Sequence, residues 1–189
     1  ICADLDDDPG DDPEDPGQGD DPVVIAAVEK SGQTTSYATG DDGDLQKGVA
    51  WPASRFTDND DGTVTDNLTG LIWLKDANRF GKKNWAHALA KCNTLADNNA
   101  DLTDGSTAGE WRLPNVKELL SLIDYGSHGP ALPDDHPFIN VQSRVYWSST
   151  TYYDPTGYAY SVGMAGGGVG LNNKDSTAPY VWPVRDETD

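Results

Sequence analysis

Four carboxylates gather in one short segment, and they are the first residues that could do chemistry. They lie within nine residues of one another, and carboxylate oxygens are ligands that Ca²⁺ prefers. The segment nearly matches an EF-type calcium loop, but the last loop position, which needs a bidentate glutamate, holds Leu68. The candidate calcium ligands are Asp58, Asp60, Asp61 and Asp66.

The same segment also carries the signal of a β-hairpin. The Asp-Asp-Gly sequence at 60–62 can supply the positive φ of a tight turn, and residues 63–65 are β-branched or suited to the returning strand. A further turn leads into the apolar run 71–74, which is typical of a buried strand. Turn chemistry favours a hairpin tip, with calcium as the alternative.

A second set of candidate residues lies in predicted loops near the C-terminus. Tyrosine offers a rigid stacking area and asparagine offers adaptable hydrogen bonds, which suits a recognition surface. A polar loop lining without a ligand is the alternative, and the sequence leaves both open. The predicted ligand-binding residues are Tyr152, Tyr153, Asp154, Tyr158, Asn172, Asn173, Lys174 and Asp175.

Catalytic residues are hard to find in this chain. His87, His128 and His136 do not have the spacing of a metal site. Cys92 shares an apolar helical stripe with Trp85, which favours a buried or bridged sulfur over a nucleophile. The sequence therefore predicts a protein that is not an enzyme and has no cofactor apart from the calcium alternative.

The chain has two cysteines, Cys2 and Cys92. An even cysteine count, few basic residues and abundant Gly, Asp, Asn, Thr and Trp are typical of an exported, extracellular bacterial protein. A disulfide between Cys2 and Cys92 would join the N-terminal segment to the domain, within a subunit or between subunits. Two free thiols are the alternative.

Charge is distributed unevenly along the 189 residues. Residues 1–22 hold ten of the 32 acidic residues, several prolines and no basic residue, which predicts an extended acidic leader. The net charge is −19, and −9 remains without that leader, so nucleic acid is an unsuitable partner. No apolar run reaches the ~20 residues of a transmembrane helix.

The remaining pattern predicts an α+β fold. Residues 23–30 form a strand and linker after the leader, and residues 31–189 form one domain. Asn84 can cap a helix whose apolar stripe runs from Trp85 to Ala96, and Asn115 with Glu118 predicts a capping box for a second helix. Short strands follow at 145–147, 158–164, 168–171 and 180–185 and complete a terminal sheet.

Five ordered motifs carry a resemblance to a known family. They are RFTDNDDGTVTDNLTGLIWLKDAN, NWAHALAKCNTLA, EWRLPNVKELLSLIDYG, YWSSTTY and YVWPVRD. Together they resemble the Lcl C-terminal-like domain family, named after the terminal domain of a collagen-like bacterial adhesin, over roughly residues 31–186. The resemblance implies a C-type-lectin-like fold, in which two helices flank small antiparallel sheets and loops present a ligand-binding face.

The resemblance implies a non-enzymatic adhesion module at the bacterial surface that binds a glycan or a protein. The calcium-binding triplets of sugar-binding lectins, Glu-Pro-Asn or Gln-Pro-Asp, do not occur in the sequence, which argues against calcium-dependent sugar binding. The alternative is a structural subunit of an extracellular filament or surface array. In that case copies of the chain would be its partners, with residues 23–28 adding a strand to a neighbour's sheet.

Overall fold

The computed structural model describes residues 28–187. The acidic leader 1–22, Cys2 and all but the last residue of the predicted strand 23–28 lie outside the described residues. In chain order the elements are α1 (Asp42–Leu45), β1 (Phe56–Asp58), β2 (Thr63–Asp66), β3 (Ile72–Leu74), α2 (Trp85–Asn93), α3 (Val116–Ser121), β4 (Val145–Thr151), β5 (Tyr158–Gly163), β6 (Gly168–Asn173) and β7 (Val184–Arg185).

The first sheet has the strand order β1-β2-β3-β7 and is antiparallel throughout. Its β1–β2 connection is the predicted hairpin, in which Asp60 and Gly62 adopt φ of 59° and 89°. A Cβ on Gly62 would lie 2.7 Å from the carbonyl oxygen of Asp101, so the turn needs glycine both for its conformation and for this close approach.

Both predicted helices are present and begin at the predicted residues. The Asn84 side chain accepts a hydrogen bond from His87 N at the start of α2, and Asn115 and Glu118 form the capping box of α3. The apolar stripe predicted for the first helix extends past its end, because α2 stops at Asn93. The four-residue α1 begins after Asp41, whose side chain accepts a hydrogen bond from Asp44 N.

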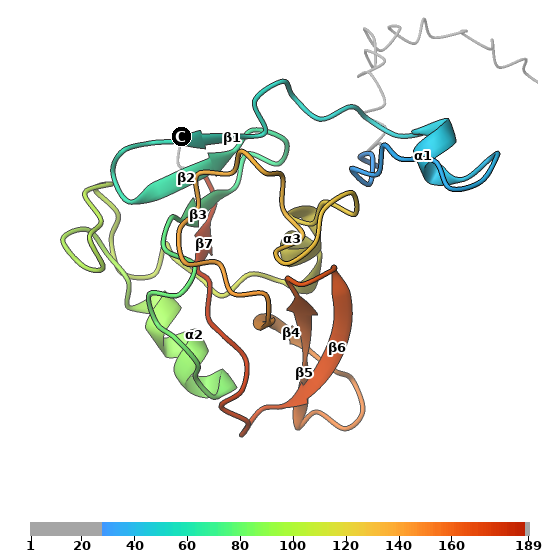
Figure 1. The fold of residues 1–189 in the computed structure, drawn as a ribbon. Coiled ribbons are helices and arrows are strands. Elements are labelled where there is room, and N and C mark those ends of the chain that lie inside the picture. Colours follow the sequence, from blue (N-terminus) through green and yellow to red (C-terminus); the bar gives the residue numbers. More distant parts are fainter. Residues whose placement is uncertain (1–27, 188–189) are drawn as a thin grey trace, which may run out of the picture.

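The second sheet has the order β4-β5-β6. The sequence predicted that residues 180–185 would complete this terminal sheet, and that prediction is wrong: β7 pairs with β3 in the first sheet. A single-residue bridge from Tyr180 to Tyr146 joins this last segment to β4. As Figure 1 shows, β7 lies beside β3, while β4–β6 form a separate sheet that both α2 and α3 contact.

Aromatic residues fill the core between these elements. Trp182 packs against Trp73, Phe138 and Tyr146, with ring centroids 5.5, 4.9 and 5.4 Å away. A smaller cluster around Cys92 and Trp147 lies between α2 and the second sheet. The α+β class predicted from the sequence is confirmed. Within residues 28–187 no helix is long and apolar enough to cross a bilayer.

Candidate functional site

The four hairpin carboxylates do not converge on one point. Asp66 is fully buried and forms a two-point ion pair with Arg55, at 2.8 and 3.0 Å. Asp58 pairs with Lys75, whose hydrogen bond lowers the pKa of that carboxyl, and Asp61 accepts two hydrogen bonds from Thr63. In the described part of the chain, no group of three or more His, Cys, Asp or Glu side chains is placed to hold a metal ion.

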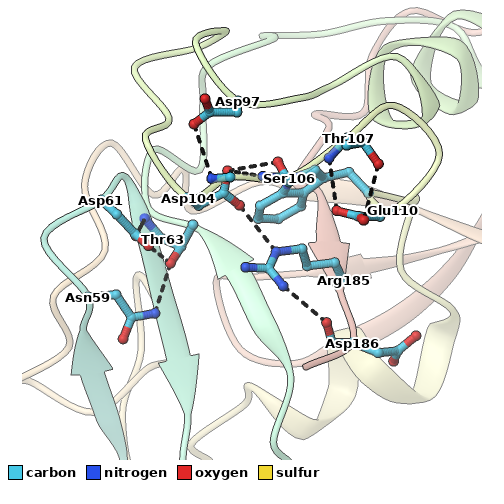
Figure 2. A network of polar contacts seen from close by, with 12 residues as sticks. Asn59, Asp61, Thr63, Asp97, Asp104, Ser106, Thr107, Glu110, Arg185 and Asp186 are labelled. Carbon is cyan, nitrogen blue, oxygen red and sulfur yellow. Dashed lines mark hydrogen bonds and ion pairs between the residues drawn. The ribbon is translucent and has the colours of Figure 1, made fainter. Parts of the chain in front are cut away.

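A polar network connects the loop before Trp111 to β7, and no local sequence pattern indicates it. The buried carboxylate of Asp104 accepts from Arg185 Nε at 3.2 Å and from the backbone and hydroxyl of Ser106 (Figure 2). Trp111 donates to the Ser106 hydroxyl, and the Arg185 guanidinium lies 5.5 Å from the Trp111 ring. These groups bind one another, so the network holds the loop before Trp111 against β7.

The predicted ligand-binding residues come together at one end of the second sheet. They follow β4, begin β5 and end β6, and antiparallel pairing places those three positions side by side. Tyr152 N donates to the Tyr158 carbonyl at 2.9 Å, and Lys174 N donates to the Gly157 carbonyl at 2.9 Å. The β4–β5 connection and the segment at the end of β6 thus lie side by side.

Three of the eight side chains bind other groups of the protein, among them Asn173, whose Oδ1 accepts from Asp175 N at 2.9 Å. Lys174 Nζ lies 4.0 Å from the centroid of the Trp85 ring and donates to the Thr151 hydroxyl. Asn172 donates to the Ser161 hydroxyl at 2.7 Å. These contacts fix the ends of the loops, and they leave the exposed Tyr153, Asp154, Tyr158 and Asp175 and the amide nitrogen of Asn173 available to a ligand.

Tyrosines and apolar residues lie next to these loops on β5, β6 and the connection between β4 and β5. Tyr152 packs on Tyr153 and Tyr160, with centroids 5.1 and 5.8 Å apart. The β5–β6 register places Leu171 opposite Tyr160 and Val169 opposite Val162, on one side of the sheet. We call this surface the tyrosine face; its residues are Tyr152, Tyr153, Tyr158, Tyr160, Val169 and Leu171.

The tyrosine face exposes an unusual amount of apolar side chain. Tyr153 is 81% exposed, Val169 50%, Leu171 43% and Tyr158 36%. Apolar residues exposed together on a surface mark interaction sites more often than isolated ones do. Sequence reasoning missed Tyr160, Val169 and Leu171, because a strand pattern does not reveal that β6 is an edge strand.

The candidate nucleophile Cys92 lies in an environment that disfavours its reactive form. Cys92 is fully buried among apolar side chains, and this burial raises the pKa of its thiol well above the ordinary value, so the thiolate is disfavoured. His87 is exposed on α2, and burial lowers the pKa of His136. The proposed bridge from Cys92 stays a prediction, since Cys2 lies outside the described residues.

A family model described as the Lcl C-terminal domain matches residues 62–185, which is more than half of the chain. No curated protein matches the sequence. The matched region runs from the hairpin turn to the last strand, and it contains both sheets apart from β1.

Proposed function

The chain belongs to the Lcl C-terminal domain family, and on that premise we propose that it is a non-enzymatic, C-type-lectin-like adhesion module that binds a glycan or protein surface through its tyrosine face. The family is adhesin-related and is not an enzyme family. This relationship agrees with a role at the cell surface or outside the cell. The observation that carries the proposal is the exposed aromatic and apolar surface on β5, β6 and the adjoining loops.

The side chains of the tyrosine face suit recognition of a neutral or weakly charged partner. Tyrosine rings supply stacking area at low entropic cost, and the neighbouring Asn173, Asp154 and Asp175 supply hydrogen-bonding groups. Two of these three are carboxylates, and the chain without its leader keeps a net charge of −9. A sulfated or phosphorylated polymer would be repelled, so the proposed ligand is a neutral glycan or a protein surface.

Removing the two most accessible rings of the site tests this function. The double variant Tyr153→Ala/Tyr158→Ala is expected to weaken binding to bacterial or host cell surfaces at least about tenfold, because aromatic anchors contribute about 1–2 kcal/mol or more each. Binding would be measured by retention of labelled protein on cells and on an array of neutral glycans and surface proteins.

The matched control is Tyr37→Ala, because Tyr37 is as exposed as Tyr153 but lies near α1. It is expected to bind like the unchanged protein. Equal binding by the control and the double variant would remove the tyrosine face as the recognition surface. Thermal unfolding of each variant would show that the fold is intact.

A second function is favoured by one further observation, the open edge of β6. This strand pairs with β5 over six residues without a bulge, and its outer edge has no strand partner among residues 28–187. Proline and charged side chains usually protect an edge strand from further pairing, and the sequence of β6 contains neither. We propose that the apolar run 23–28 of a neighbouring copy adds to this edge and assembles the protein into a filament or array.

Charging the edge is expected to prevent such assembly. Val169→Lys/Leu171→Lys should convert an assembled sample to monomers in light scattering, because charged side chains on β6 oppose the addition of a strand to its edge. Deletion of residues 1–27 should have the same effect, because it removes most of the strand that would be added. Thr57→Lys on β1, an edge strand of the other sheet, is the control and should leave assembly unchanged. A full chain that stays monomeric at every concentration would rule out this function.

A further inference from the structure

A pocket lies between the N-terminal part of the domain and the loop after α3, away from the residues of the tyrosine face. Its volume is about 450 Å³, within the ~300–1,000 Å³ range of small-molecule sites. One wall comes from residues before β1 and the other from the segment that follows α3. The side chains that matter for its chemistry are Lys30, Gln33, Gln46, Ala50, Trp51 and Asp124.

The two walls are held together by specific contacts. Tyr125 N donates to the Ser31 carbonyl at 2.9 Å across the junction. Gly32 lies at the contact with φ of 89°, and a Cβ there would meet Asp124 Oδ1 at 2.2 Å and the Trp51 ring at 2.8 Å. Glycine is therefore required for these two side chains to approach the backbone so closely.

The pocket side chains are also oriented before any ligand arrives. Trp51 Nε1 donates to the Lys30 carbonyl at 3.0 Å, which fixes the plane of the indole. The Asp124 carboxylate accepts from Gly126 N at 2.7 Å and from the Ser127 hydroxyl at 3.1 Å. A site whose groups are already positioned loses less entropy when it binds.

The combination of side chains selects the class of ligand. Lys30 and Asp124 place one positive and one negative charge on the same pocket, so neither an anion nor a cation is favoured overall. The amides of Gln33 and Gln46 both donate and accept. Trp51 adds an aromatic surface. The Arg55 guanidinium lies 4.7 Å from the centroid of the Trp51 ring, so the cation–π interaction of this ring is already formed within the protein.

A neutral, polyhydroxylated ring matches every one of these features. Each hydroxyl can donate to a carboxylate or amide oxygen and accept from an ammonium or amide N–H, while the C–H side of the ring packs on the indole. We propose that this pocket binds a neutral saccharide unit. Its first wall precedes residue 62, where the family match begins, and its lining residues are separate from those of the tyrosine face.

Filling the pocket tests the proposal on the full chain. The probes are the methyl glycosides of glucose, galactose, mannose and N-acetylglucosamine, titrated by calorimetry and by ¹⁵N–¹H NMR of the Trp51 indole N–H, assigned with Trp51→Phe. At least one glycoside is expected to bind and to shift this resonance. Ala50→Trp, which places a large ring at an exposed lining position, should weaken that binding more than about tenfold.

Two further variants separate the possible outcomes. Ala86→Trp, the same change at an exposed position of α2, should bind the glycoside unchanged, while Gln33→Ala should weaken it. Absence of binding by all four glycosides, or equal binding by Ala50→Trp and Ala86→Trp, would overturn the proposal. If Tyr153→Ala/Tyr158→Ala alone removed glycoside binding, the pocket would be rejected and the tyrosine face supported.

Discussion

Replacing Asp66 with alanine is expected to lower the free energy of unfolding by about 3–5 kcal/mol, because it leaves the buried guanidinium of Arg55 without its counter-charge. Both side chains are almost completely buried, and Arg55 donates to both carboxylate oxygens and to the Ser121 carbonyl. Asp66 also accepts from Leu68 N and the Thr69 hydroxyl in the turn before β3. The substitution thus also removes these two side-chain hydrogen bonds of the turn.

Urea unfolding followed by tryptophan fluorescence would measure this loss. Asp101→Ala is the matched control, because it breaks the exposed ion pair with Arg79 and should cost at most about 1 kcal/mol. Replacing both buried partners, as in Arg55→Met/Asp66→Leu, should cost less than Asp66→Ala, since no buried charge is left unpaired. A loss for Asp66→Ala no larger than that of Asp101→Ala would contradict this account of the pair.

Elements with a local signal could be predicted from the sequence. The β1–β2 hairpin follows from a turn sequence that needs positive φ, and α3 follows from the Asn115 and Glu118 capping pair. α2 begins at the predicted cap, but its end was placed too late, because the apolar spacing continues into the following turn. In each case the residues that decide the structure lie within one or two turns of each other.

Pairings between distant residues could not be predicted in this way. β7 joins β3 although the residues before it also reach β4, and no local pattern in a two-residue strand selects between the sheets. Arg185 binds Asp104, which lies 81 residues earlier in the chain. Asp66 was a candidate calcium ligand in the sequence, but in the fold its carboxylate pairs with Arg55. These contacts depend on tertiary packing, which overrides local preference.

The candidate site also combines features that could be predicted from the sequence with features that depend on the fold. Its loop residues were predicted from their types, because tyrosine and asparagine in turns suit recognition. Their convergence on one surface depends on the β4-β5-β6 order, and the part played by Val169 and Leu171 depends on β6 being at the edge. The pocket beside Trp51 had no sequence signal, since Gly32 and Asp124 are brought together only by the fold.

Trp182→Ala is expected to cost about 3–5 kcal/mol, the range for truncating a buried aromatic side chain. Trp182 is completely buried, and its ring contacts Trp73, Phe138 and Tyr146, which come from the first sheet, the loop before β4, and β4 itself. Its indole N–H donates to the Leu74 carbonyl at 2.8 Å. Truncation would leave a cavity between both sheets and remove the side-chain donor to the last residue of β3.

The free energy of unfolding, measured by urea titration with far-ultraviolet circular dichroism, would show this loss. Tyr153→Ala, an exposed aromatic truncation on the tyrosine face, should change stability by no more than about 0.5 kcal/mol. Trp182→Phe should recover part of the loss, because it keeps most of the ring contacts but not the donor to Leu74. Equal stability of Trp182→Ala and Tyr153→Ala would mean that the two sheets do not share this core. The contacts of Trp182 would then not hold the sheet that carries the tyrosine face against the first sheet.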